Sequence, residues 1–294
     1  MARDRILITG CRGQLGRDLV DYLRPTRDVV GVDIGDFDIT DYRAVNDAWS
    51  RHKPTVVLHA AAYTDVDGCE DNRAIAMSVN GEGTANVAMA CKRRKARLIY
   101  YSTDYVFDGT SRRPYVEEDT PNPLTVYGQS KLAGERAVVA ASEDHIVMRI
   151  AWLYGRHGSN FVKTMLRLGN QQLGGERGIL RVVDDQFGNP TWTVEIARQT
   201  EALLESDIRG IVHATSVDVA TWFGFAQEIF RLAGMPVEIA PCKTSEYPRP
   251  APRPGNSDLL NRRLEQHNLA LMQPWDLALA EFIDRSGKAI VDEL

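Results

Sequence analysis

Short apolar runs alternate with longer amphipathic segments over the first half of the chain. The apolar runs lie at 5–9, 28–32, 55–60, 97–102 and 145–151. Helical spacing of apolar residues falls between them, at about 14–23, 41–52, 72–94 and 126–141. Continuous apolar runs are typical of parallel strands that are buried on both faces. Their alternation with helices therefore predicts an α/β fold built on a doubly wound parallel sheet.

A glycine-rich turn links the first apolar run to the first helical segment. Gly10, Gly13 and Gly16 have the spacing that permits a tight turn, a close approach to a pyrophosphate and helix–strand packing. Asp33, at the end of the second run, suits a ribose hydroxyl and favours NAD, whereas Arg12 suits a 2′-phosphate and favours NADP. We expect a Rossmann-type fold that binds NADPH, with NADH as the alternative.

The pattern changes after about residue 152, where turn-rich segments separate a few helices. The proline-dense stretch 247–257 excludes helix and central strand. Because an amphipathic stretch follows it, we expect an ordered loop that lines a site. We divide the chain into a dinucleotide-binding Rossmann domain at 1–151 and a smaller, mainly substrate-binding region at 152–294. Some segments of the second region are expected to return to the sheet.

Tyr127 and Lys131 stand four positions apart on one face of the predicted helix 126–141. The spacing alone is common, and an exposed aromatic–cation pair explains it equally well. An ammonium one turn away would lower the tyrosine pKa from its usual value of about 10. Ser102 and Thr103 end the fourth apolar run, at the sheet edge where ligands bind. Together these residues predict carbonyl reduction, with a tyrosine proton donor, a hydroxyl on the carbonyl oxygen and a nicotinamide hydride.

Composition narrows the cellular setting. The 35 basic and 40 acidic residues give a net charge of −5 without a long basic run, which argues against nucleic acid as a partner. The four cysteines match neither a disulfide framework nor a metal motif and favour a reducing compartment. No run reaches the roughly 18 apolar residues that span a bilayer. The N-terminal "MARDRILITG" lacks the apolar core of a signal peptide. We expect a cytoplasmic protein without membrane association.

The glycine loop, the strand-end hydroxyls and the tyrosine–lysine pair resemble the extended short-chain dehydrogenase/reductase superfamily. Longer stretches, among them "STDYVFDG", "PNPLTVYGQSKLAGE", "VVDDQFGNPT" and "YPRPAPRPGNSDL", resemble the dTDP-4-dehydrorhamnose reductase family over nearly the whole chain. The resemblance implies NAD(P)H-dependent reduction of the C4 ketone of dTDP-4-dehydro-β-L-rhamnose to dTDP-L-rhamnose. Such a reaction serves nucleotide-sugar synthesis for cell-surface polysaccharide.

The resemblance also assigns roles by motif position. It implies Tyr127 as proton donor, Lys131 as its partner on the cofactor ribose and Thr103 as the hydroxyl that tunes the acid. Cofactor contacts are implied at Gly10, Gly13, Gln14, Leu15, Gly16, Asp33, Asp38, Ile39, Ala61, Ala62, Tyr63, Tyr127 and Lys131. Asn80 is either a support of the active site or a polar residue packed within a helix.

Substrate contacts are expected at Thr103, Asp104, Trp152 and Arg253. Trp152 offers a flat face for a sugar or base, although a lone tryptophan also suits a core. The guanidinium of Arg253, and less so that of Arg249, suits a diphosphate because its donors match phosphate oxygens.

Three rival activities use related residues. Dehydratases of the superfamily carry an Asp-Glu pair after the strand-end threonine, whereas this chain has Asp104 followed by Tyr105, which favours reduction. An epimerase shares the tyrosine, lysine and cofactor but keeps its nicotinamide tightly bound. A non-catalytic subunit is the third alternative, since the regulatory subunit of eukaryotic methionine adenosyltransferase resembles the same family. The complete set of Tyr127, Lys131 and Thr103 favours catalysis.

Some family members are proposed to form homodimers around magnesium through glutamates. Glu195 fits one such position, but Asp18 stands where another glutamate is expected. We therefore assign no metal and leave magnesium binding and a homodimer open. The final stretch "SGKAIVDEL" has no interpretation.

Overall fold

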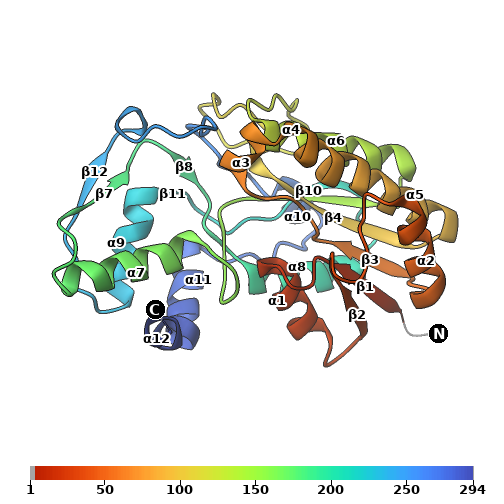
Figure 1. The fold of residues 1–294 in the computed structure, drawn as a ribbon, viewed down its shortest axis with the longest axis horizontal. Helices are drawn as coiled ribbons and strands as arrows, with labels where there is room; N and C mark the ends of the chain where they lie inside the picture. The colour runs from red at the N-terminus through yellow and green to blue at the C-terminus, as the bar shows by residue number, and fades with distance from the viewer. Residues whose placement is uncertain (1–3, 294) are drawn as a thin grey trace.

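The computed structural model describes residues 4–293 and shows two lobes side by side (Figure 1). Residues 1–3, part of the charged stretch expected before the first strand, lie outside the described residues, as does Leu294 of the uninterpreted tail.

A six-stranded parallel sheet forms the centre of the larger lobe, in the order β10–β5–β4–β3–β1–β2. Its strands are β1 (Arg5–Thr9), β2 (Asp28–Val32), β3 (Val56–His59), β4 (Arg97–Thr103), β5 (Ile146–Ile150) and β10 (Gly210–His213). Each of the five predicted apolar runs forms a strand, and the predicted Rossmann-type fold class is confirmed. The chain direction across the sheet reverses between β1 and β3, so a ligand crevice is expected there, at the carboxyl ends of the strands.

Helices cover both faces of this sheet (Figure 1). One layer contains α2 (Tyr42–His52), α5 (Thr84–Arg94) and α6 (Val126–Ala141), and the other contains α1 (Gln14–Leu23) and α8 (Thr193–Leu204). Along β1 the buried side chains alternate, since Ile6 and Ile8 pack in the cluster that includes Leu19, whereas Leu7 packs with Trp49. This two-residue period on a strand buried on both sides explains the continuous apolar run.

The predicted helix 72–94 is interrupted. The chain after β3 forms α3 (Val66–Asp71), α4 (Arg73–Ala76), the π-helix η1 (Met77–Gly83) and then α5. A π-helix is one residue wider per turn than an α-helix and frequently lies at a functional site. Apolar periodicity does not distinguish such a wide turn from regular helix.

The second lobe packs its helices around an apolar cluster centred on Phe225 and Phe282. Its helices are α7 (Phe161–Leu173), α9 (Trp222–Leu232), α11 (Trp275–Phe282) and α12 (Lys288–Asp292), and its short strands are β6 (Leu153–Tyr154), β7 (Leu180–Val183), β8 (Phe187–Gly188), β9 (Thr191–Trp192), β11 (Ala220–Thr221) and β12 (Ile239–Cys242). The remaining short elements are α10 (Arg262–Gln266), the 3-10 helices η2 (Asp104–Val106) and η3 (Thr244–Glu246), and the π-helix η4 (Ile283–Gly287).

Three elements from the second half of the chain belong to the larger lobe, and one of them is α10, which packs against β10. β10 pairs with β5 at the edge of the sheet, and α8 packs against α1. The boundary at 151/152 itself stays a prediction. Among residues 4–293, no helix combines the length and apolar character needed to cross a membrane.

Candidate active site

The glycine loop between β1 and α1 has no room for side chains at two of its glycines. Gly10 has a positive φ of 71°, and a Cβ there would lie 2.6 Å from the backbone nitrogen of Ala61. A Cβ on Gly16 would lie 2.0 Å from the carbonyl oxygen of Gly10. Gly13 caps the N-terminus of α1, so the free N–H groups of that helix point out of the loop. This loop has the shape that a dinucleotide pyrophosphate requires.

A cavity of about 370 Å³ lies beside the glycine loop, at the switch point between β1 and β3. Of the residues expected to contact the cofactor, it is lined by Gly10, Gly13, Asp33, Asp38, Ile39, Ala61, Ala62 and Tyr63. The carboxylate of Asp33 already accepts hydrogen bonds from the backbone nitrogens of Arg12 at 2.8 Å and Ile34 at 2.9 Å. The Arg12 guanidinium is exposed and lies 3.8 Å from Asp36.

A larger cavity of about 690 Å³ runs from the glycine loop, past the end of β4, to the second lobe. It is lined by Gly13, Gln14, Leu15 and Gly16 and by every residue expected to act in catalysis or to bind substrate: Thr103, Asp104, Tyr127, Lys131, Trp152 and Arg253. Both cavities share Gly13 and Ala62, so they adjoin. Residues from distant parts of the chain thus meet at one place.

The pKa of Tyr127 is raised above its usual value, contrary to the expectation that Lys131 lowers it. Burial is the main cause and the charge of Asp104 the second, while a hydrogen bond with Thr103 acts in the opposite direction. Burial also lowers the pKa of Lys131 to about 7, although Glu135 partly opposes the shift. The Lys131 Nζ donates to the carbonyl of Tyr101 at 2.7 Å. Desolvation therefore outweighs the pairing that the spacing suggests.

Thr103 and Asp104 form a hydrogen-bonded pair at the end of β4. The Thr103 Oγ1 donates to the Asp104 Oδ1 at 2.9 Å and accepts the Tyr105 N–H at 3.2 Å. The other Asp104 oxygen makes no hydrogen bond of ordinary geometry within residues 4–293, although Ser257 lies beside the carboxylate. Asp104 is only 3% exposed, and burial raises its pKa to about 6. Asp104 thus borders the cavity with almost no accessible surface, and its carboxylate lies between Thr103 and Ser257.

Ser102 has a different environment from Thr103. Its hydroxyl donates to the Glu135 Oε1 at 2.5 Å, and Glu135 also forms a buried ion pair with Arg149 at 2.8 Å. Ser102 therefore joins α6 to the sheet, whereas Thr103 forms a side-chain hydrogen bond with Tyr127.

Asn80 lies in the wide turn of η1 and is fully buried. Its amide nitrogen donates to the Ser130 Oγ at 2.9 Å, and its amide oxygen accepts the Tyr63 N–H at 2.8 Å. Tyr63 lines the smaller cavity and Ser130 belongs to α6. Asn80 thus connects the wall of the cofactor cavity to the helix that carries Tyr127.

Trp152 stacks on Trp222, with ring centroids 3.5 Å apart and planes 6° from parallel. The backbone of Trp152 has a positive φ of 45°, and a Cβ on Gly188 would lie 2.5 Å from its indole ring. Trp222 also lines the larger cavity. Sequence reasoning missed Trp222, because its place at the start of the amphipathic helix α9 gives no local sign of its stacking partner.

The proline-rich segment 247–257, here called the strap, lines the mouth of the larger cavity through Tyr247, Arg249, Arg253, Pro254 and Ser257. The Arg253 guanidinium donates to the Oδ2 of Asp67 at 2.9 Å, and Arg249 lies 3.6 Å from the same atom. Sequence reasoning also missed Asp67, which belongs to α3.

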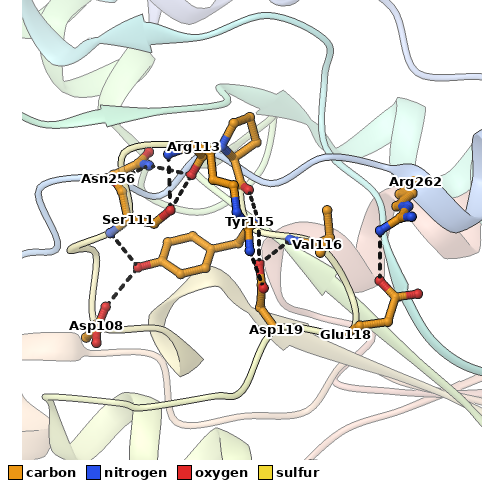
Figure 2. Close-up of polar contacts among 10 residues, drawn as sticks. Asp108, Ser111, Arg113, Tyr115, Val116, Glu118, Asp119, Asn256 and Arg262 are labelled. Carbon is orange, nitrogen blue, oxygen red and sulfur yellow. Dashed lines mark hydrogen bonds and ion pairs between the residues drawn. The ribbon is translucent and has the colours of Figure 1, made fainter.

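The far end of the strap is held by the loop after β4. Figure 2 shows the Asn256 side chain donating to the carbonyls of Ser111 at 3.0 Å and Arg113 at 3.2 Å. Two contacts within this loop fix its shape (Figure 2). The Tyr115 hydroxyl donates to the Asp108 Oδ1 at 2.8 Å, and Arg113 forms an ion pair with Asp119 at 2.6 Å. The strap is thus anchored at its middle by Asp67 and at its far end by the loop after β4.

One group of side chains within residues 4–293 has the spacing of metal ligands, and it consists of Asp18, Asp21 and His157. Asp18 already accepts a hydrogen bond from Thr193, and Glu195 is bonded to Ser216 at 3.3 Å. Magnesium prefers a nearly octahedral set of oxygen ligands. A set that contains an imidazole and an occupied carboxylate does not fit that ion.

The chain is similar to known proteins in both sequence and structure. A family model described as the RmlD substrate binding domain matches residues 4–287. The chain is 42% identical to a dTDP-4-keto-6-deoxy-D-glucose reductase of Streptomyces niveus, over 95% of this chain and 96% of that protein. It is also 42% identical to a dTDP-4-dehydrorhamnose reductase of Streptomyces griseus, over 95% and 93% of the two chains. A crystal structure of dTDP-4-dehydrorhamnose reductase from Bacillus anthracis in complex with NADP superposes with a TM-score of 0.92, at 37% identity, over 96% and 99% of the two chains.

Proposed function

The chain belongs to the family of the RmlD substrate binding domain, which includes dTDP-4-dehydrorhamnose reductases, and we therefore propose that it reduces the C4 ketone of dTDP-4-dehydro-β-L-rhamnose to dTDP-L-rhamnose. The observation that carries the proposal is the larger cavity, where the glycine loop, Tyr127, Lys131 and the Thr103–Asp104 pair meet. Reduction requires a dinucleotide site and a proton donor on one cavity, and the glycine loop and Tyr127 are the groups proposed for these two roles.

NADPH is the proposed cofactor. The residues fit a dinucleotide, because the glycine loop leaves no room for side chains and the helix α1 begins there. Asp33 has its carboxylate bonded to two backbone N–H groups, whereas the Arg12 guanidinium is exposed and, within the described part of the chain, makes only a long ion pair with Asp36, so it can meet a 2′-phosphate. A related reductase was solved in complex with NADP, which agrees with this preference. When bound, the nicotinamide supplies the hydride that the C4 carbon accepts.

Tyr127 delivers the proton. Its raised pKa keeps the phenol protonated at neutral pH, so the hydroxyl donates to the substrate oxygen as negative charge develops there. Lys131 then stabilises the phenolate. The Lys131 side chain is only half protonated near pH 7 in this structure. An oxygen ligand beside Nζ would raise its pKa and so favour the charged ammonium.

Thr103 holds the oxygen of Tyr127 and is itself oriented by Asp104. The hydrogen bond between Thr103 and Tyr127 acts to lower the tyrosine pKa, so Thr103 favours the phenolate that remains once the proton has left.

Substrate binding is assigned to the walls of the same cavity. Asp104, which lines the cavity, contacts a sugar hydroxyl, the Trp152–Trp222 stack supplies a flat apolar wall, and the strap arginines face the diphosphate. A 4-keto-6-deoxyglucose nucleotide is the second candidate substrate, because a relative named for that reduction is as similar as the rhamnose-forming one.

The test is NADPH oxidation with dTDP-4-dehydro-β-L-rhamnose, with the product identified by NMR. Tyr127→Phe is expected to lower turnover by roughly 100-fold or more while NADPH binding stays unchanged, since only the acid is lost. Tyr42→Phe is the matched control, because the Tyr42 hydroxyl on α2 has no hydrogen-bond partner among residues 4–293. Unchanged turnover in Tyr127→Phe would remove the proposed mechanism.

The same assay separates the rival activities. Absence of NADPH and NADH oxidation with this substrate refutes the assignment, and oxidation only with dTDP-4-keto-6-deoxy-D-glucose supports the second candidate. Conversion of substrate by protein that carries its own nicotinamide, without consumption of added NADPH, identifies an epimerase.

A further inference from the structure

Asp67 forms contacts with three groups of the strap. Its Oδ1 accepts the Ala251 N–H at 3.2 Å and its Oδ2 accepts the Arg253 guanidinium at 2.9 Å, with Arg249 at 3.6 Å. The Arg253 NH1 also donates to the Ala251 carbonyl at 2.9 Å. One carboxylate thus joins the backbone and the side chains of the strap to α3.

The strap has few other means of attachment near this point. Pro248, Pro250, Pro252 and Pro254 alternate with the residues that contact Asp67, and proline has no N–H to donate. The bond from Ala251 to Asp67 is therefore one of the few backbone hydrogen bonds available here. Ala251 itself is fully buried, so the contact fixes the depth of the strap as well as its direction.

α3 is a firm support for this contact. Its Glu70 side chain accepts the N–H of Val126, the first residue of α6, at 2.9 Å. Cys69 of the same helix packs in an apolar cluster with Tyr127. The strap, α3 and the helix of the proton donor are consequently connected through adjacent residues.

The charges around Asp67 leave an excess of one positive charge. The guanidinium groups of Arg249 and Arg253 share the Asp67 carboxylate. The negative charge of its Oδ2, which lies near both, offsets the repulsion between the two positive charges. Burial, the hydrogen bonds and both arginines act on Asp67, and the net effect is a lowered pKa, so the group is ionised at neutral pH. Asp67 thereby holds two guanidinium groups together beside the cavity. These guanidinium groups keep N–H donors that do not contact Asp67 and can bind another anion.

We propose that Asp67 is a positioning residue for the nucleotide sugar: it holds the strap closed over the larger cavity, so that Arg249 and Arg253 face the substrate diphosphate. The inference rests on the proposed function, because it takes a nucleoside diphosphate as the anion. Arg253, which makes the shorter contacts, fixes the strap, and the half-exposed Arg249 has donors left for the diphosphate.

The experiment measures dTDP binding by calorimetry and steady-state kinetics for the full chain and for Asp67→Asn. The variant is expected to bind dTDP about tenfold more weakly and to raise KM for the nucleotide sugar by a similar factor, while kcat and KM for NADPH stay within about twofold. Hydrogen exchange at the Ala251 amide is expected to accelerate. Arg253→Gln should cause a similar loss, and the double variant should lose little more, because both remove the same contact.

Glu228→Gln is the matched control, since it breaks an exposed ion pair with Arg231 on α9. If Asp67→Asn binds dTDP as tightly as the unmodified protein, or more tightly, Asp67 only competes for the arginines and the proposal is wrong. If Asp67→Asn does not fold, Arg253→Gln takes its place, and unchanged dTDP affinity in that variant overturns the proposal equally. Failure of the unmodified protein to bind dTDP refutes the proposed function instead.

Discussion

Replacement of Asp104 by asparagine tests whether this carboxylate controls the low-pH limit of the reaction. Its pKa of about 6 predicts that the group is ionised above pH 6 and protonated below it. A protonated Asp104 no longer accepts from both Thr103 and a sugar hydroxyl as a carboxylate does. Lys131, with a pKa of about 7, limits activity on the other side, because its neutral amine does not stabilise the phenolate. The pH profile of kcat/KM, which reports the free enzyme, should therefore be a narrow bell centred between the two values.

The size of the effect follows from these values. At pH 5 only about one-tenth of Asp104 is ionised, so kcat/KM should be about tenfold below its maximum, and it should fall by a further factor of ten per pH unit. Asp104→Asn should abolish this acid limb and leave the basic limb of Lys131. Its maximum should itself be about tenfold lower, because a neutral amide accepts a hydrogen bond less strongly than a carboxylate does.

The assay is NADPH oxidation from pH 5 to pH 9, with NADPH binding and thermal unfolding measured at each end of the range. Glu117→Gln is the control, because Glu117 is another buried carboxyl group with a raised pKa but does not line either cavity. That variant should keep the acid limb. An acid limb that persists near pH 6 in Asp104→Asn would show that a different group titrates, and the role assigned to Asp104 would be wrong.

Two further predictions concern stability and the cofactor site. Burial raises the pKa of Glu195 to about 7, so the folded state binds its proton more tightly than the unfolded state and stability falls as pH rises from about 4.5 to 7. Glu195→Gln should remove this fall, with a gain of up to ~3 kcal/mol at pH 8 and little change at pH 4.5 in urea unfolding, and an unaltered pH slope would contradict the cause. Gly16→Ala should abolish NADPH binding or folding, because its Cβ meets backbone at 2.0 Å. Gly178→Ala, which has no heavy atom within 4 Å of the added Cβ, should leave both intact, and equal effects of the two changes would refute the steric argument.

The elements of the larger lobe were predictable because their signals are local. The strands at β1 to β5 are continuous apolar runs, and the glycine loop and the Tyr127–Lys131 spacing each fit within a few consecutive residues. Backbone geometry converts such spacing directly into a turn or a shared helix face. The exception is the wide turn at Asn80, since a π-helix preserves apolar character while it shifts the phase of the helix.

The sequence by itself therefore determined the sheet and the glycine turn, and it predicted Tyr127 as the proton donor. Only the tertiary structure decided the electrostatics and the shape of the substrate side. Asp67 contacts Arg253, although the two residues lie 186 positions apart in the sequence. Trp222 likewise stacks on Trp152 from a distant part of the chain. The lowered pKa of Lys131 and the raised pKa of Asp104 arise from burial. The burial of a side chain depends on neighbours from distant segments of the chain, so no local sequence pattern predicts these pKa shifts.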